Sequence, residues 1–232
     1  EEVGKKMVHY NLMSAPVVDD NDHLLGIIQS NELVDIFIEE ASEDIQKMAA
    51  LSPLKYPYFE TPFFRLLYER CYILLALFIA QSFSTTIMAA YSDTLRLGLM
   101  LFTGMLVSTG GNASNQTSAV AIQGMATGDI NQSNIRRFIR RELLMALVLA
   151  VALGMAAFIR GYITTHDCLD SLAIALSQGF IVLVSISIGS CVPIVLKKLN
   201  IDPAFAAGPF LATIMDILGI LIFCTVTRYL LF

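Results

Sequence analysis

The sequence predicts an all-α membrane protein with five transmembrane helices, preceded by a short acidic α/β segment. Two observations predict this fold class. Of the 232 residues, 56% are hydrophobic and only 15% are charged, whereas soluble domains carry about 45–50% apolar and about 25% charged residues. The charge is also divided, because residues 1–60 hold twelve acidic residues and four lysines, whereas residues 61–232 hold eight acidic and eleven basic residues. This composition excludes an ordinary soluble enzyme, a disordered chain, a basic nucleic-acid-binding protein and a disulfide-built secreted scaffold.

The first part of the chain has the pattern of the end of a small α/β domain. Apolar residues at 15–18 and 24–28 flank the turn-forming run at 19–22, which predicts a hairpin. Residues 30–37 then combine a polar cap with apolar residues at helical spacing. A unit of about 40 residues cannot bury a core alone. We therefore expect it to lean on further sequence of a longer protein or on a partner chain.

The rest of the chain is almost wholly apolar and contains five candidate membrane spans. A helix needs about 20 predominantly apolar residues to cross a bilayer. The five segments run from about Pro62 to Ala90, Thr94 to Ala126, Asn134 to Tyr162, Asp170 to Leu199 and Pro203 to Phe232.

The basic residues of the short loops predict the orientation of these spans. Arginines 136, 137, 140 and 141 lie between the second and third spans, and lysines 197 and 198 lie between the fourth and fifth. The loops on the other side hold only Arg96 and Arg160. Because Lys and Arg accumulate in cytoplasmic loops, we expect a cytoplasmic N-terminus and an extracytoplasmic C-terminus.

The second span contains a polar run, Gly110–Ser118, that cannot face lipid. Unsatisfied amide groups in hydrocarbon cost several kcal/mol each, so the run must face other helices or water. Two interpretations follow and both stay open. The small and polar residues either hold helices together or form the wall of a pore or substrate path.

Asp216 is the most informative single residue, because it lies near the middle of the fifth span. A carboxylate at that depth costs about 2.5–3.5 kcal/mol on insertion scales. It is either held by hydroxyl and amide groups of neighbouring helices or forms an ion or proton site. Glu142, which follows Arg141 at a helix end, has the position of an ion pair or an interfacial anchor.

Several kinds of chemistry find no motif in this chain. No span offers a histidine to activate a serine, HExxH and GxxxxGK[ST] are absent, and the four cysteines show no CxxC or CxxH spacing. The sequence therefore favours passive or ion-coupled passage past one carboxylate, and we expect no enzyme activity.

Specific motifs resemble the MgtE family of magnesium channels. The run Gly110-Gly111-Asn112-Ala113-Ser114-Asn115-Gln116 resembles the GGNxxNQ signature of that family. Residues 202–219 resemble its last helix, residues 41–45 the start of its connecting helix, and residues 14–40 the second half of a CBS domain. The resemblance covers essentially the whole chain in the expected order. It implies a CBS-domain part over residues 1–40, a connecting helix and linker over 41–60, and a pore domain over 61–232.

The resemblance also implies a mechanism. The chain is expected to form a homodimer in a bacterial-type inner or plasma membrane, with one pore on the two-fold axis. Asp216 and the Ala212 carbonyl group are expected to hold a hydrated Mg²⁺ ion, which agrees with the reluctance of Mg²⁺ to lose water. The expected pore-lining residues are Asn112, Asn115, Gly208 and Thr213. Gly208 departs from the asparagine of some relatives.

The acidic residues near the cytoplasmic end are the expected sensor of intracellular Mg²⁺. They comprise Glu32, Asp35, Glu40, Glu43, Asp44 and Asp202. Bound ions would cancel the repulsion among these groups and hold the connecting helices over the pore. From the charge pattern alone, the same residues also fit a solvated helix face.

Three functional hypotheses remain at this point. The first is a channel that moves Mg²⁺ inward, with Mg²⁺ as transported and regulatory ion and with no role for nucleic acid. The second is an ion-coupled carrier of another divalent cation such as Mn²⁺ or Co²⁺, for which Met215 is a neighbouring soft ligand. The third is a membrane-anchored regulatory protein without a pore, in which Asp216 is dispensable.

Overall fold

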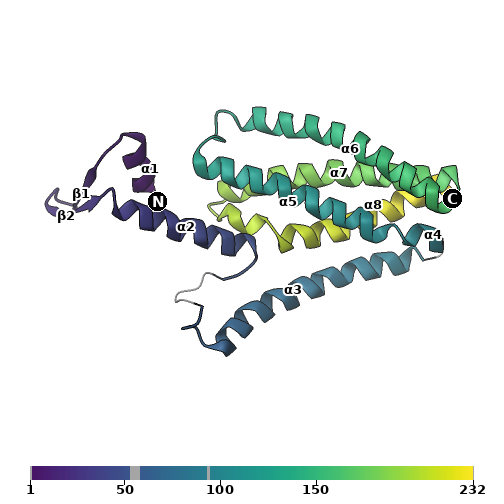
Figure 1. Cartoon of the computed structure of the whole chain (residues 1–232), viewed down its shortest axis with the longest axis horizontal. Helices are drawn as coiled ribbons and strands as arrows, with labels where there is room; N and C mark the ends of the chain where they lie inside the picture. The colour runs from purple at the N-terminus through teal and green to yellow at the C-terminus, as the bar shows by residue number, and fades with distance from the viewer. Residues whose placement is uncertain (1, 53–57, 93–94, 232) are drawn as a thin grey trace. The chain divides into compact units, whose positions relative to one another are not determined.

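The computed structural model describes residues 2–52, 58–92 and 95–231, most of which are helical (Figure 1). The chain divides into two compact units, Glu1–Lys47 and Met48–Phe232. We describe each unit by itself.

The first unit contains a helix, a hairpin and the start of a second helix. Helix α1 (Glu2–His9) precedes strands β1 (Ser14–Val18) and β2 (Leu24–Gln29), and helix α2 (Glu32–Met48) follows. The strands pair antiparallel, with Val17 opposite Gly26, which confirms the predicted hairpin and the helix after it. Helix α1 was not predicted. Helix α2 passes without a break through residues 40 and 41, where the resemblance separates two segments.

The turn between the strands is built on Asp19. Its carboxylate accepts hydrogen bonds from the backbone N–H groups of His23, at 2.8 Å, and Asn21, at 2.9 Å. The bond from the His23 backbone is the largest cause of the lowered pKa of Asp19. Such side-chain bonds replace backbone partners that a tight turn leaves unpaired. The sequence Asp-Asp-Asn-Asp therefore forms a turn because the carboxylate of its first residue accepts hydrogen bonds from nearby backbone N–H groups.

Few residues of the first unit are buried. Met7 and Leu33 are 1% and 5% exposed, while Leu24, Leu25 and Ile27 of β2 are all more than half exposed. A strand with apolar side chains on both faces is typical of a sheet that is covered on both sides. This exposure supports the expectation that residues outside the unit cover its apolar side chains.

The second unit is a bundle of long helices. Its elements are α3 (Phe63–Ala90), α4 (Leu97–Met100), α5 (Thr103–Thr127), α6 (Ile135–Thr165), α7 (Cys168–Lys198), the 3₁₀ helix η1 (Pro203–Ala206) and α8 (Pro209–Leu231). Among the described residues, four of these helices are long and apolar enough to cross a membrane, namely α3, α6, α7 and α8. Helix α5 coincides with most of the second predicted span, and its polar run keeps it out of this set.

One predicted helix start is wrong, and another lies outside the described residues. The second span, predicted to start at Thr94, is described from residue 95 and contains the short helix α4 followed by α5, which begins at Thr103. The fifth span begins at Pro209 rather than Pro203. Asp202 instead caps the 3₁₀ helix through the Ala204 N–H, and Gly208 adopts a left-handed φ of 63°. This conformation, which glycine tolerates, separates the 3₁₀ helix from α8.

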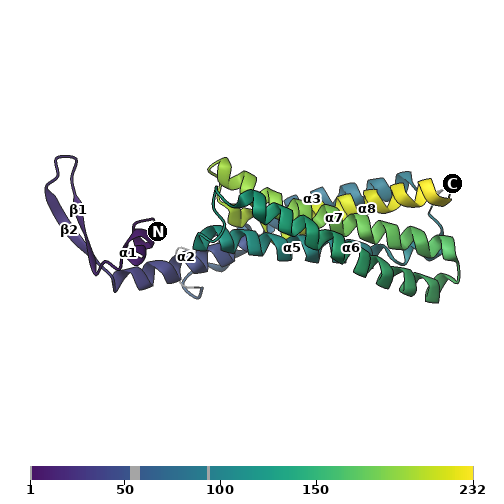
Figure 2. The ribbon, with the colours of Figure 1, turned by 90° about the horizontal axis from the view of Figure 1, so that it is seen from above.

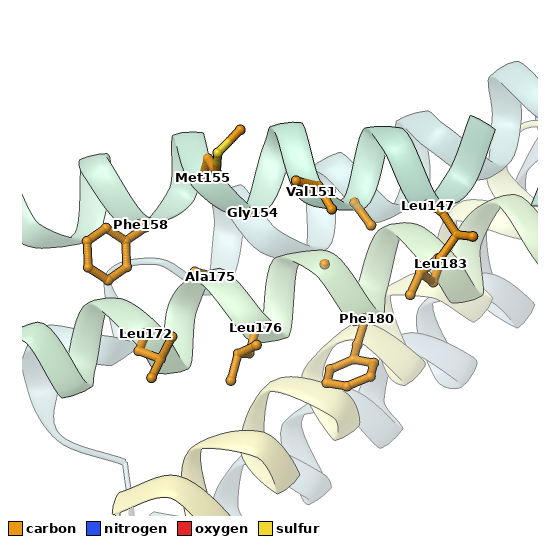
Figure 3. A pocket seen from close by; sticks show the side chains of 12 residues that line it. Leu147, Val151, Gly154, Met155, Phe158, Leu172, Ala175, Leu176, Phe180 and Leu183 are labelled. Carbon is orange, nitrogen blue, oxygen red and sulfur yellow. The ribbon is translucent and has the colours of Figure 1, made fainter. Parts of the chain in front are cut away.

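The bundle core lies among α5, α7 and α8. Leu106 of α5, Ile181 of α7 and Met215 of α8 are fully buried at 0% exposure. Helix α6 packs along α7, and α3 packs against α8 on another side of the bundle (Figures 1 and 2). The outer surface of α6 and α7 carries an apolar groove of about 410 Å³, with Gly154 and Ala175 between large side chains such as Phe158 and Phe180 (Figure 3).

Two glycines bring α5 and α7 into close contact. A methyl group on Gly189 would lie 2.4 Å from the carbonyl oxygen of Ser114, and one on Gly110 would lie 2.7 Å from Ile181 Cγ2. Distances below 3.0 Å leave no room for a side chain. Since both contacts advance in the same chain direction, the two helices run parallel.

Candidate ion pathway

Asp216 lies in the third turn of α8, and its side chain is half-buried. The side-chain amide of Gln81, on α3, lies near the carboxyl group of Asp216. Because the amide nitrogen of glutamine is a donor and a carboxylate only accepts, Gln81 donates in this pair when Asp216 is ionised. Asp216, the carboxylate of the fifth predicted span, therefore has a polar partner on a different helix.

Gln81 is the contact that sequence reasoning misses. An amide within an apolar span is itself a signal of a polar partner, and residues 71–80 before Gln81 contain no charged residue. The sequence alone does not identify that partner, because it does not show that α3 packs parallel to α8. A second contact further along the same pair of helices places the guanidinium carbon of Arg228 5.9 Å from the centre of the Tyr91 ring.

Ala212, one turn before Asp216, lies against the signature run of α5. The position of a methyl group on Gly111 is 3.7 Å from Ala212 Cα, an ordinary van der Waals distance. The absence of a side chain at Gly111 thus brings the α5 backbone close to the turn of α8 that precedes the carboxylate.

The polar run of α5 has two faces with different surroundings. Gly110, Ser114 and Thr117 are buried in the bundle, where the hydroxyl group of Ser114 donates to the Gly111 carbonyl at 2.9 Å. Asn112 and Gln116, one turn apart on another face, are exposed. The interpretation as a helix contact is confirmed for the buried face. The exposed face remains open to the second interpretation.

The remaining predicted pore residues lie near this region in different ways. Asn115 is half-buried, and within the described part of the chain its Oδ1 atom has no hydrogen-bond partner. The Thr213 hydroxyl donates to the Pro209 carbonyl in the first turn of α8, at 2.9 Å. Gly208 directly precedes that turn. The Asn115 amide oxygen is therefore buried without a hydrogen-bond partner among the described residues, whereas the Thr213 hydroxyl donates its hydrogen within its own helix.

The predicted sensor residues are distributed over both units. Five of them follow one another along α2, where the carboxylate of Glu32 accepts from the Gln29 N–H at 3.0 Å and that of Glu43 pairs with Lys47 at 2.5 Å. Asp202 belongs to the second unit and caps η1. Across residues 2–52, 58–92 and 95–231, no three His, Cys, Asp or Glu side chains form a group that could hold a metal ion.

The basic residues separate between the two ends of the bundle. At the end where α5 joins α6, the Lys197 ammonium group donates to the Met125 carbonyl at 3.2 Å. At the opposite end, Arg96 pairs with Asp170 of α7 at 3.3 Å. The two sets of loops that the charge pattern distinguishes are therefore at different ends, as alternating spans require.

Comparison with known proteins gives consistent matches. The model of the MgtE family, described as a divalent cation transporter, matches residues 103–226. The magnesium transporter MgtE of Bacillus subtilis is 31% identical over 225 residues, which is 96% of this chain and 49% of that protein. The protein of the same name from Thermus thermophilus is 30% identical over 233 residues, 100% of this chain and 52% of that protein.

A third relative, the magnesium transporter MgtE of Enterococcus faecalis, is 28% identical over 232 residues, 96% of this chain and 49% of that protein. The chain thus spans about half the length of the curated relatives it matches. The family match covers α5 with its glycine-asparagine run and most of α8 with Asp216. With its long apolar helices and this match, the chain is an integral membrane protein and belongs to the MgtE family of divalent cation transporters.

Proposed function

We propose that this chain forms the pore of a magnesium channel, in which Asp216 holds the ion on its way through the membrane. The observation that carries the proposal is a carboxylate in the third turn of an apolar helix, one turn after a contact with the polar run of α5. An ionisable group at that depth is expensive, and groups of this kind mark ion pathways. Mg²⁺ is often bound through one or two carboxylates while it keeps several waters. The three relatives carry the name magnesium transporter.

The pore would lie between two copies of the chain. Asn112 and Gln116 are exposed amide residues one turn apart on α5. Lipid cannot satisfy such groups, but a water-filled path on a two-fold axis can. A second copy would cover the exposed polar stripe formed by Asn112 and Gln116 and would bring a second Asp216 to the same axis. Helix α5, the second predicted span, would then also cross the membrane, with glycine and hydroxyl residues toward its own bundle and amide residues toward the pore.

The orientation follows from the same assignment. The end of the bundle with the four arginines of early α6 and the lysines of late α7 would be cytoplasmic, which puts the C-terminus outside. The acidic residues of α2 would then sense cytoplasmic Mg²⁺ and, with Asp202, close the pore when the ion is abundant. Residues 1–40 would be the last part of a CBS domain, with residues 41–60 as the connecting helix and linker.

A carrier of a softer ion is the alternative function, and the burial of Met215 argues against it. The Met215 side chain is 0% exposed, and its methyl carbon lies near Gly110 of α5. The thioether is thus part of the core packing. Oxygen ligands suit Mg²⁺ and also Mn²⁺, whereas softer ions such as Co²⁺ more often recruit nitrogen or sulfur.

Mg²⁺ flux into vesicles that contain the whole chain tests the proposal. We expect flux with the parent chain and none above protein-free vesicles with Asp216→Asn, which keeps the shape of the side chain and removes its charge. Asp129→Asn is the matched control, because Asp129 is exposed in the loop between α5 and α6, and its flux should equal that of the parent. Equal flux with Asp216→Asn and the parent would disprove the proposed site, and dependence on a proton or Na⁺ gradient would favour the carrier.

A further inference from the structure

A second polar site lies away from Asp216, at the end of the bundle where α5 joins α6. A cavity of about 260 Å³ is enclosed there by the loop after α5, the first turn of α6 and the last turns of α7. Its polar lining comes from Asn131, Gln132, Lys197 and Lys198. In the part of the chain that the structure describes, no aspartate or glutamate lines it.

The two lysines have different surroundings. The Lys197 ammonium group donates to the Met125 carbonyl, one of the last carbonyl groups of α5, at 3.2 Å. Both lysine side chains are exposed. Among the described residues, the Lys198 ammonium group has no hydrogen-bond or ion-pair partner. One positive charge is therefore anchored to the fold, and the other is available to a ligand.

The start of α6 adds to the positive potential. Asn134, the residue before the helix, does not cap it with its side chain. The Asn134 amide instead accepts from the Asn131 N–H at 2.9 Å and donates to the Asp129 carbonyl at 2.7 Å. The first turn of a helix carries partial positive charge on its N–H groups, and Ile135, the first residue of α6, lines the cavity.

The rest of the lining is apolar. Met125, Ile130, Ile135 and Ile194 provide it. The cavity therefore pairs an ammonium-lined part with a hydrocarbon-lined part, at the end of two helices that are long enough to cross a membrane. Lipid headgroups lie at such helix ends, and basic pockets between membrane helices bind the headgroups of anionic lipids.

We propose that this cavity binds the phosphate group of an anionic phospholipid, with Lys198 and Lys197 at the phosphate and the apolar lining against the first part of an acyl chain. Lysine binds phosphate as a point charge, which fits two ammonium groups without a planar fork. Free inorganic phosphate is also an anion, but it has no hydrocarbon part that could contact the apolar lining. The proposal does not depend on the ion that the chain transports.

Native mass spectrometry of the whole chain in detergent, with added phosphatidylglycerol, measures this binding directly. We expect phosphatidylglycerol to bind in preference to phosphatidylcholine, and inorganic phosphate at equal concentration to leave it bound. The double variant Lys197→Gln, Lys198→Gln should bind phosphatidylglycerol at least about tenfold more weakly. Lys197→Arg with Lys198→Arg, which keeps both charges, should bind like the parent.

The matched control removes two charges at the same end of the bundle. Arg136 and Arg137 lie in the first turn of α6 and do not line the cavity, so Arg136→Gln with Arg137→Gln should change binding by less than about threefold. Lys198→Gln alone isolates the ligand effect if loss of the Lys197 contact to α5 disturbs folding, and it should also weaken binding. Equal losses in the lysine and arginine variants, equal binding of phosphatidylcholine, or displacement by inorganic phosphate would each overturn the proposal.

Discussion

At the scale of single residues, the proposed ion ligand Asp216 has a polar neighbour, Gln81. The pair joins α3 to α8, and its carboxylate is the group that we propose as the ion ligand. A hydrogen bond to a charged group contributes about 1.5–3 kcal/mol, more than a bond between neutral groups. The amide of Gln81 therefore restricts the orientations of the carboxylate, in addition to compensating for its burial.

Replacement of Gln81 by leucine tests this positioning role. We expect Gln81→Leu to raise the Mg²⁺ concentration for half-maximal flux about tenfold, because the free carboxylate no longer has a fixed orientation. Gln81→Asn, which keeps the amide on a shorter side chain, should restore part of the affinity. The measurement is flux into vesicles over a series of Mg²⁺ concentrations.

Ser82→Ala is the control for that series. The Ser82 hydroxyl is exposed and donates to the Ile79 carbonyl of its own helix at 2.6 Å, so its loss should leave the concentration dependence unchanged. A Gln81→Leu variant with the parent's concentration dependence would show that Asp216 needs no partner on α3.

Asp19 makes the turn of the first unit sensitive to acid. Its folded pKa is lowered from 3.8, first by the His23 backbone N–H. The bonds to the carboxylate therefore stabilise the turn above the unfolded pKa and are lost as pH falls through the lower folded pKa. A pH titration of the His23 amide chemical shift should have its midpoint below 3.8 and should disappear in Asp19→Asn. A midpoint at or above the ordinary value would contradict the role of these bonds.

At the scale of helices, the contact between α5 and α7 has no room for a side chain at Gly189. The substitution Gly189→Ala would place a methyl carbon 2.4 Å from the Ser114 carbonyl oxygen. Forced insertion of a methyl group into a packed core costs about 1–3 kcal/mol. We therefore expect a lower midpoint of thermal unfolding in detergent.

Gly104→Ala provides the comparison, since a methyl group at Gly104 of α5 meets nothing within 4 Å. It should leave the midpoint unchanged or raise it, because alanine has the higher helix propensity by about 1 kcal/mol. If both variants unfold at the same temperature as the parent, the two helices are less closely packed than the contact requires.

The apolar helices were predictable because their composition alone determines them. Helices α6 and α7 begin and end within a few residues of the predicted spans, since an uninterrupted apolar run has one stable conformation in a bilayer. The end of the chain was less predictable. The Gly208-Pro209 pair was the available signal, because a Gly-Pro pair marks a turn and proline favours the first position of a helix, but glycine tolerates both helical and left-handed conformations, so the sign of its φ was not determined.

The candidate site was predictable only in part, and for a different reason. A carboxylate in an apolar span identified Asp216 without any structure. The faces of α5 could not be assigned, because glycine, serine and asparagine pack against a helix as readily as they line water. The pairing of Gly110 with Ile181, and of Asp216 with Gln81, depends on which helices are neighbours, and one sequence does not contain that information.

At the scale of the whole molecule, the exposed polar stripe of α5 requires a partner or water in the membrane. We predict that the purified chain has twice the mass of one 25.5 kDa copy in native mass spectrometry. Asn112→Leu with Gln116→Leu should abolish Mg²⁺ flux, because leucine makes this face compatible with lipid and closes a polar path.

A double substitution to leucine on an exposed apolar face of α6 is the control. Val148 and Val151 of α6 are 70% and 63% exposed, and their replacement by leucine should leave flux and mass unchanged. A mass of one copy together with normal flux would disprove a pore shared by two chains.

The close contacts of Gly110 and Gly189 have a mechanical consequence. Helices α5 and α7 touch at two levels, each through a glycine that leaves no room for a side chain of its own, so neither can slide or rotate against the other without a collision of backbone and side-chain atoms. Helix α8 follows a 3₁₀ turn and a left-handed glycine, a connection whose few backbone torsions can absorb a change of direction. Movement that widens or narrows the space beside Asp216 must therefore tilt α8 against a rigid pair of helices, with its pivot at residues 202–208.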